Sequence, residues 1–211
     1  MNRRTLGHLL AASLGLALLA VTPFVRAADE APDALIKRLS TDALETIKAD
    51  KAIQAGDIAK VIALVDSKIM PNVNFTRMTA SAVGRNWRQA TPEQQKRLQD
   101  EFKVLLVRTY SSALSQVKDQ SFNVKPLRAA PADAEVVVRT EIIGRGDPVQ
   151  LDYRMEKTSG GWKIYDLNVL GVWLVETYRT QFAQEINAKG IDGLIESLAQ
   201  RNKANTGEKK S

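Results

Sequence analysis

The chain has 211 residues, and its 30 basic and 24 acidic side chains give a formal net charge of +6. It contains no cysteine, and its single histidine is His8. Because neither residue type occurs after residue 8, the rest of the chain cannot form Ser-His-Asp or Cys-His nucleophilic sites, zinc or haem sites built from histidine and cysteine, or disulfide bonds.

Residues 1–27 have the three parts of an export signal: a charged start, an uncharged apolar stretch over residues 9–21, and a small-residue cleavage site ending at Ala27. The apolar stretch is shorter than the roughly 20 residues that a membrane-spanning helix needs. We therefore expect cleavage after Ala27 and export to the periplasm. Residues 28–211 are expected to form a single domain with a polar tail from about residue 202.

The predicted domain carries little net charge. Three of the 30 basic residues and no acidic residue lie in the leader, which leaves 27 basic against 24 acidic side chains. No block of lysine and arginine is interleaved with aromatic residues, so we expect no nucleic-acid partner.

Three helices are predicted in the first part of this domain. Apolar residues recur at helical spacing over residues 32–47, 58–69 and 75–82. Pro71 ends the second segment and Gly84 closes the third. A short turn around a tryptophan follows.

The clearest helix start is at Thr91. Its side chain can accept a hydrogen bond from the backbone of Gln94, Pro92 suits the first helical position, and Gln94 can complete a capping box. The helix is expected to run for roughly 25 residues and to end near residues 119–121.

The period then changes from helical to alternating. Strands are predicted over residues 122–127, 135–143, 149–156 and 162–169, joined by short loops that contain glycine. Two further helices, separated at Gly190, complete the chain. The expected fold is α+β, with a four-stranded antiparallel sheet whose buried face packs against several helices around a hydrophobic cavity.

Motifs for catalysis are weak. Residues 115–118 match the S-x-x-K pattern of penicillin-recognising enzymes, but the companion motifs are missing. No phosphate-binding glycine loop or paired-acid metal loop occurs. A basic group, defined as Arg85, Arg88, Lys96 and Arg97, is interpreted as a solvated surface, with an acidic partner or lipid head groups as the alternative. The aromatic and methionine positions are typical of a core, and the pattern alone leaves a ligand pocket open.

Two stretches supply a family resemblance. Residues 74–94, which include Asn-Phe-Thr-Arg-Met and Gly-Arg-Asn-Trp-Arg-Gln-Ala-Thr-Pro-Glu-Gln, resemble the central signature of the MlaC family, also called the toluene-tolerance family. Residues 161–182 resemble its C-terminal signature, and residues 190–194 follow at the expected distance. The main departure is Trp173, where the family pattern has a smaller polar residue; we expect it to reshape the mouth of a pocket.

The resemblance implies a periplasmic phospholipid carrier rather than an enzyme. Such a carrier moves lipid between an outer-membrane Mla lipoprotein-porin complex and an inner-membrane transporter with an MCE domain, and so maintains outer-membrane lipid asymmetry. Phospholipid is then the cargo, and no cofactor is expected. Two rivals remain: a hydrolase that uses carboxylates, which needs two acids at the pocket, and a ligand-free periplasmic adaptor.

A carrier needs an apolar slot between the sheet and the helices. From the periodicity we expect its walls to come from alternate strand positions and from the helical stripes that face them. The predicted lining residues are Met78, Phe102, Leu105, Leu106, Val138, Ile142, Leu151, Tyr153, Met155, Val172, Tyr178 and Phe182.

Overall fold

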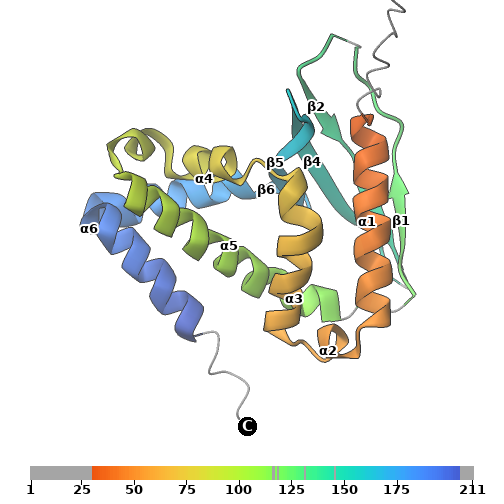
Figure 1. Cartoon of the computed structure of the whole chain (residues 1–211), viewed down its shortest axis with the longest axis horizontal. Helices are drawn as coiled ribbons and strands as arrows, with labels where there is room; N and C mark the ends of the chain where they lie inside the picture. Colours follow the sequence, from red (N-terminus) through yellow and green to blue (C-terminus); the bar gives the residue numbers. More distant parts are fainter. Residues whose placement is uncertain (1–29, 116, 118, 131, 145, 205–211) are drawn as a thin grey trace, which may run out of the picture.

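The computed structural model describes residues 30–115, 117, 119–130, 132–144 and 146–204, so the predicted export signal lies outside the described residues. The helices are α1 (Pro32–Ala49), α2 (Lys51–Gln54), α3 (Ile58–Leu64), α4 (Phe75–Val83), α5 (Pro92–Ser115) and α6 (Leu174–Ala204). The strands are β1 (Ser121–Val124), β2 (Glu135–Val138), β3 (Thr140–Ile143), β4 (Val149–Thr158), β5 (Gly161–Val169) and β6 (Val172–Trp173). Helix α1 runs along the sheet, and α4, α5 and α6 form a helical layer to one side (Figure 1).

The sheet is an antiparallel meander in the order β1-β3-β4-β5-β6, and β2 also pairs with β4. The α+β class and the meander are therefore confirmed, but the expected strand number is wrong. The strand predicted over residues 135–143 is divided at Arg139. There the backbone N–H of Thr140 donates to the Asp152 side chain (3.2 Å) and the Thr140 hydroxyl donates to the Leu151 carbonyl, so side chains interrupt the backbone ladder. The short strand β6 was not predicted.

A β-bulge lies in β5. Met155 pairs with Ile164, whereas the preceding residue, Arg154, pairs with Asp166, which leaves Tyr165 as the extra residue. A bulge of this kind changes which residues face each side of the sheet. After the bulge, Leu167 rather than Asp166 lies opposite the apolar residue of β4.

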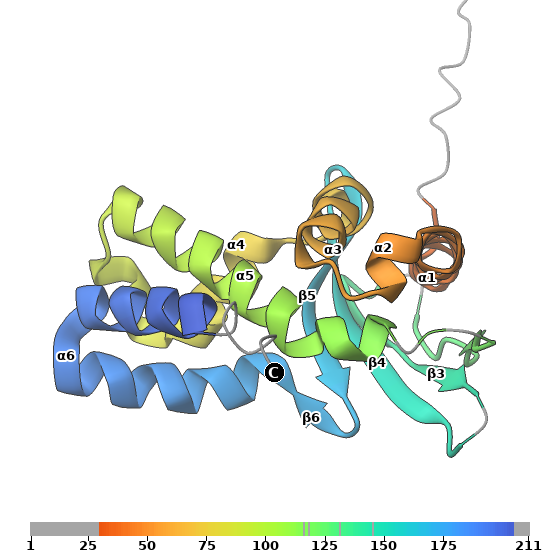
Figure 2. The same ribbon diagram turned by 90° about the horizontal axis from the view of Figure 1, so that it is seen from below.

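Two predicted helix boundaries, the start of α5 and the break at Gly190, are found in the structure. The Gln94 backbone N–H donates to Thr91 Oγ1 (3.2 Å), and the Thr91 backbone N–H donates to Gln94 Oε1 (3.0 Å). Gly190, with a φ of 71°, divides α6 into two arms that lie side by side (Figure 2). The second arm continues to Ala204, and the Asn202 side chain is buried, so the helix extends past the predicted start of the tail.

The second predicted helix is shorter than expected. Helix α3 ends at Leu64, and the chain continues as a π-helical turn over Val65–Ile69 and a 3-10 turn over Met70–Asn72. A 3-10 turn over Gly84–Gln89 contains the tryptophan noted in the sequence. Within the described residues, no helix is long and apolar enough to cross a membrane.

Apolar side chains form three clusters. The helical cluster is built by α4, α5 and α6 around Phe102. The sheet cluster is built by α1 against β2, β4 and β5. The third cluster joins α1, α2 and α3 to α5. Val73 and Leu167 pack against both the helical and the sheet clusters, so these two residues mark where the layers meet.

Candidate functional site

The apolar face of the sheet is closed at one end. Met155 and Ile164, which pair across β4 and β5, are both buried in the sheet cluster beneath α1. At the next apolar pair, Tyr153 is still buried whereas Leu167 is half-buried. Burial raises the pKa of Tyr153 to about 12, although neighbouring hydroxyl groups on α1 and β3 oppose the shift. This end of the face is a packed core.

The same face is open at its other end. Leu151 lies opposite Val169, and both side chains are half-buried. Beyond them, Val149 pairs with Ile142 and is 36% exposed, and Val172 pairs with Val169 and is 51% exposed. Residues that pair directly across antiparallel strands share a face. Burial therefore falls steadily along one continuous apolar surface.

Helix α5 approaches this open end. Its Leu106 and Tyr110 are half-buried and pack against the helical cluster, as do Leu167 and Val169 of β5. Thr109, which lies between Leu106 and Tyr110 in the sequence, is exposed. Helix α5 thus presents half-buried apolar side chains beside the open part of the sheet. The arrangement gives an apolar surface with one covered and one accessible end, which suits a hydrocarbon ligand. We call this region the open apolar end, defined by Leu106, Tyr110, Leu151, Val169 and Val172.

The predicted lining residues divide into three groups. In the helical cluster lie Met78, Phe102, Leu105, Tyr178 and Phe182. In the sheet cluster lie Val138, Tyr153 and Met155. The remaining four, which keep exposed surface, are Leu106, Ile142, Leu151 and Val172.

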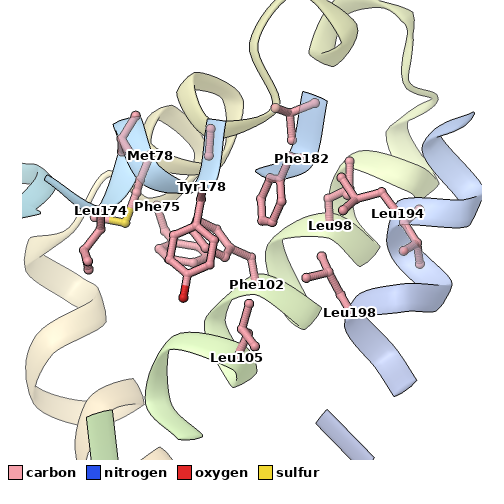
Figure 3. Close-up of a cluster of buried hydrophobic side chains, with 14 of the residues drawn as sticks. Phe75, Met78, Leu98, Phe102, Leu105, Leu174, Tyr178, Phe182, Leu194 and Leu198 are labelled. Atoms are coloured by element: carbon pink, nitrogen blue, oxygen red, sulfur yellow. The ribbon is translucent and has the colours of Figure 1, made fainter. Parts of the chain in front are cut away.

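The aromatic residues of the first group pack against one another. The Phe102 side chain has no exposed surface, and its ring centroid is 4.9 Å from that of Tyr178 and 5.1 Å from that of Phe182, both edge-on (Figure 3). Such contacts are typical of a closed aromatic core. The structure therefore brings these rings together within the helical layer and does not align them with the strands of the sheet.

The opposite face of the sheet is polar. The Arg154 guanidinium lies 3.9 Å from the centroid of the Trp173 ring and donates to Asp166 (3.0 Å). Asp166 also accepts from the backbone N–H of Val175 (3.0 Å) and so caps the start of α6. Burial raises the pKa of Asp166, although these hydrogen bonds oppose the shift. Since Trp173 pairs with Asn168 on this polar face, it does not border the open apolar end, contrary to our expectation.

A second arginine ties the helical layer to the same polar face. Arg77, in α4, donates to Glu156 (2.5 Å) and Glu135 (2.6 Å), and its guanidinium lies 3.6 Å from the centroid of the Tyr165 ring. The Tyr165 hydroxyl donates to Glu135 (3.0 Å). We call these four residues the Arg77 clamp; it joins α4 to β2, β4 and β5.

The arrangement offers little for acid-base chemistry. The buried carboxylates Asp152 and Asp166 occupy the polar face, where they accept hydrogen bonds from Thr140 and Arg154, and not the open apolar end. In the described part of the chain, no three histidine, cysteine, aspartate or glutamate residues gather as a metal site. Of the S-x-x-K pattern at residues 115–118, residues 116 and 118 lie outside the described residues.

Two surface features are separate from this site. A shallow depression between the arms of α6 is lined by Gln181, Gln184, Glu185, Ala188, Lys189 and Arg201, and this polar lining does not suit a hydrocarbon. The basic group is exposed on α5 and the preceding turn, and its Lys96 pairs with Asp100 (2.6 Å).

Comparison with known proteins identifies the family. The family model described as MlaC protein matches residues 37–200. The chain belongs to the MlaC family. A solved structure, described as the phospholipid-binding protein from Ralstonia solanacearum in complex with a phospholipid, is 48% identical, with a TM-score of 0.81; the match covers 85% of this chain and 99% of that chain.

Two curated relatives agree with membership of the MlaC family. The toluene tolerance protein ttg2D from Pseudomonas putida is 27% identical over 84% of this chain and 83% of its own length. The intermembrane phospholipid transport system binding protein MlaC from Haemophilus influenzae is 23% identical over 82% of this chain and 83% of its own length.

Sequence reasoning missed Tyr110 and Val169 at the open apolar end of this MlaC family member. The bulge at Tyr165 hides Val169, because uninterrupted alternation from Trp162 would place Asp166 and not Leu167 on the apolar face. The alternation of Asp166, Leu167, Asn168 and Val169 was the available signal. Tyr110 lies four residues after Leu106, on the same helical stripe, and helical spacing could have included it.

Proposed function

We propose that this MlaC family member is a phospholipid carrier and that the open apolar end receives the acyl chains of its cargo. The observation that carries the proposal is the loss of burial along one continuous apolar face, from Met155 to Val172. The 48% identical Ralstonia protein, which was solved with a phospholipid, supports the choice of ligand.

The twelve predicted lining residues enter this proposal with different roles. Leu106, Ile142, Leu151 and Val172 line the accessible part of the slot, together with Tyr110 and Val169. The buried residues of the sheet and helical clusters form its closed walls. Because Phe102 packs against three other rings, a chain that reached it would have to displace one of them.

The energetics suit a carrier. Each buried methylene group contributes about 0.8 kcal/mol relative to water, so two acyl chains of about 16 carbons gain on the order of 25 kcal/mol. A free phospholipid would, however, lie in a bilayer, where its chains are equally well removed from water. The net free energy of transfer between bilayer and protein is therefore near balance, and docking partners set the direction.

The family assignment extends the proposal to the cellular role. The export signal expected over residues 1–27 would deliver the protein to the periplasm. There it would carry phospholipid between the outer-membrane Mla lipoprotein-porin complex and the inner-membrane transporter with an MCE domain, with no catalytic step. The alternative is a ligand-free adaptor with a solid core.

Organic extraction of the purified protein followed by mass spectrometry tests the proposal. A carrier yields phospholipid at one or more molecules per chain. An adaptor yields none above the amount found with an unrelated exported protein prepared in the same way. The second result would reject the proposed function.

A further inference from the structure

The most exposed large apolar side chains of the described chain gather at one place. Leu170 is 67% exposed, Val172 51%, Ile143 41% and Val149 36%, and no other large apolar residue among those described is as exposed. We call these four residues the apolar tip. Single exposed apolar residues are ordinary on protein surfaces, but a group of them marks an interaction site.

Backbone pairing holds the apolar tip together. Leu170 and Gly171 form the turn between β5 and β6, closed by the pair Val169 and Val172. The Leu170 backbone N–H donates to the Gln150 carbonyl (3.1 Å), which brings this turn beside the start of β4. Both segments project from the same edge of the molecule, away from the helices (Figure 2).

The tip has exposed apolar side chains on both faces of the sheet. Val149 and Val172 lie on the apolar face of the sheet, Ile143 lies on the other face because it follows Ile142, and Leu170 occupies the turn. Apolar residues on both faces of a projecting edge can all contact the hydrocarbon of a bilayer at the same time. A flat protein partner would cover only one of these sides.

Leu170 is also an unusual residue for its backbone conformation. Its φ of 53° is the only positive value at a non-glycine residue in the described chain. With Gly171 at 87°, the turn has both central residues in the left-handed region, where asparagine and glycine are favoured. An exposed leucine with a positive φ stabilises neither the core nor the turn, and this indicates that its side chain has a function at the surface.

We propose that the apolar tip inserts into the surface of a phospholipid bilayer. The inference rests on the proposed function, since Val172 belongs both to the tip and to the open apolar end, so a lipid could pass between bilayer and slot without crossing water. The exposed area of four aliphatic side chains is on the order of a few hundred Å², well below the roughly 800 Å² per partner of a stable protein interface. Shallow insertion of a small apolar group gives the weak, reversible contact that a carrier requires.

Flotation with phosphatidylcholine vesicles in a density gradient tests the inference. The wild-type chain is compared with Leu170→Asn, which removes the hydrocarbon but suits the left-handed turn, and with Leu170→Met, which keeps the hydrocarbon and the strain. We expect wild type and Leu170→Met to float equally. We expect the vesicle partition of Leu170→Asn to fall about tenfold, with unchanged thermal stability or a higher one.

The outcomes distinguish bilayer insertion by the apolar tip from lipid binding at the open apolar end. Equal flotation of Leu170→Asn and wild type would overturn the inference. Absence of the wild type from the vesicle layer would also overturn it and would assign the tip to a protein partner. Phospholipid extracted from each variant is measured in parallel. Normal lipid content with weak flotation in Leu170→Asn supports the tip, whereas lipid-free wild type would reject the proposed function whatever the flotation result.

Discussion

Leu151 of β4 lies directly opposite Val169 of β5, and both side chains are half-buried, whereas Met155 and Ile164, further along the same strands, are buried. Met155 and Ile164 lie within the buried sheet cluster, whereas Leu151 packs only at its margin. The pair of Leu151 and Val169 marks the position where the apolar face passes from packed core to accessible surface.

A charge at Leu151 should prevent lipid binding. Leu151→Glu places a carboxylate where acyl chains are proposed to lie, and burying an unpaired charge costs several kcal/mol. We expect the ratio of extracted phospholipid to protein to fall about tenfold or more. Because Leu151 is half-buried, the variant should still fold.

The matched control for that variant is Val137→Glu, which puts the same charge on the polar face of the same sheet, opposite Arg154. Its lipid content should equal that of the wild type. Equal lipid loss in both variants would show that the charge acts through stability and not through the slot.

The Arg77 clamp should contribute to stability through its planar geometry. Arg77 contacts two carboxylates and a ring, and Glu156 is largely buried, with 17% of its side chain exposed. We expect Arg77→Ala to lower the free energy of unfolding by about 2 kcal/mol, and Arg77→Lys to recover less than half of this loss, since lysine lacks the bidentate fork. Urea denaturation measures both.

Arg38→Ala provides the comparison for the clamp, because its ion pair with Glu30 is exposed on both sides. Such pairs contribute about 1 kcal/mol or less. If Arg77→Lys is as stable as the wild type, the clamp depends on charge alone and the geometric explanation is wrong.

The capping box at the start of α5 is predicted to stabilise the helical layer. Thr91→Ala removes the acceptor for the Gln94 backbone N–H and should lower the free energy of unfolding by about 1 kcal/mol. Gln89→Ala, at an exposed position two residues earlier, should have little effect. Equal midpoints of urea unfolding for the two variants would contradict the cap.

Tyr153 should make the protein less stable in alkaline solution. The folded chain holds the Tyr153 proton up to a pKa of about 12, whereas the unfolded chain releases it near the ordinary pKa of about 10. Stability from this group is therefore fully present below pH 10 and is lost as the pH rises from 10 to 12. Unfolding curves of the wild type and Tyr153→Phe across this range provide the measurement, and parallel losses in both proteins would exclude Tyr153 as the cause.

Local signals in the sequence predicted most of the elements. Thr91 and Gln94 predicted the start of α5, and Gly190 predicted the division of α6, because capping and left-handed turns depend on neighbouring residues. The meander followed from alternation in the strands. These features need no knowledge of distant contacts.

The candidate site was harder to predict because burial depends on which elements meet. Phe102 and Leu151 both occupy apolar stripes, yet the first is enclosed by rings from α6 and the second remains half-buried. Periodicity predicts which face of an element a side chain lies on, but not how completely neighbouring elements bury it. The split at Arg139 was hidden for a related reason, since the Asp152 side chain that receives the Thr140 N–H comes from another strand.

Photo-crosslinking tests the central claim most directly. The purified protein is loaded with a phospholipid that carries a diazirine near the end of one acyl chain, irradiated and digested, and the crosslinked peptides are identified by mass spectrometry. The proposed slot predicts crosslinks in β4, β5 and the second half of α5, around Leu106, Leu151 and Val169. Crosslinks confined to the outer surface of α6, or an even distribution over the chain, would contradict it.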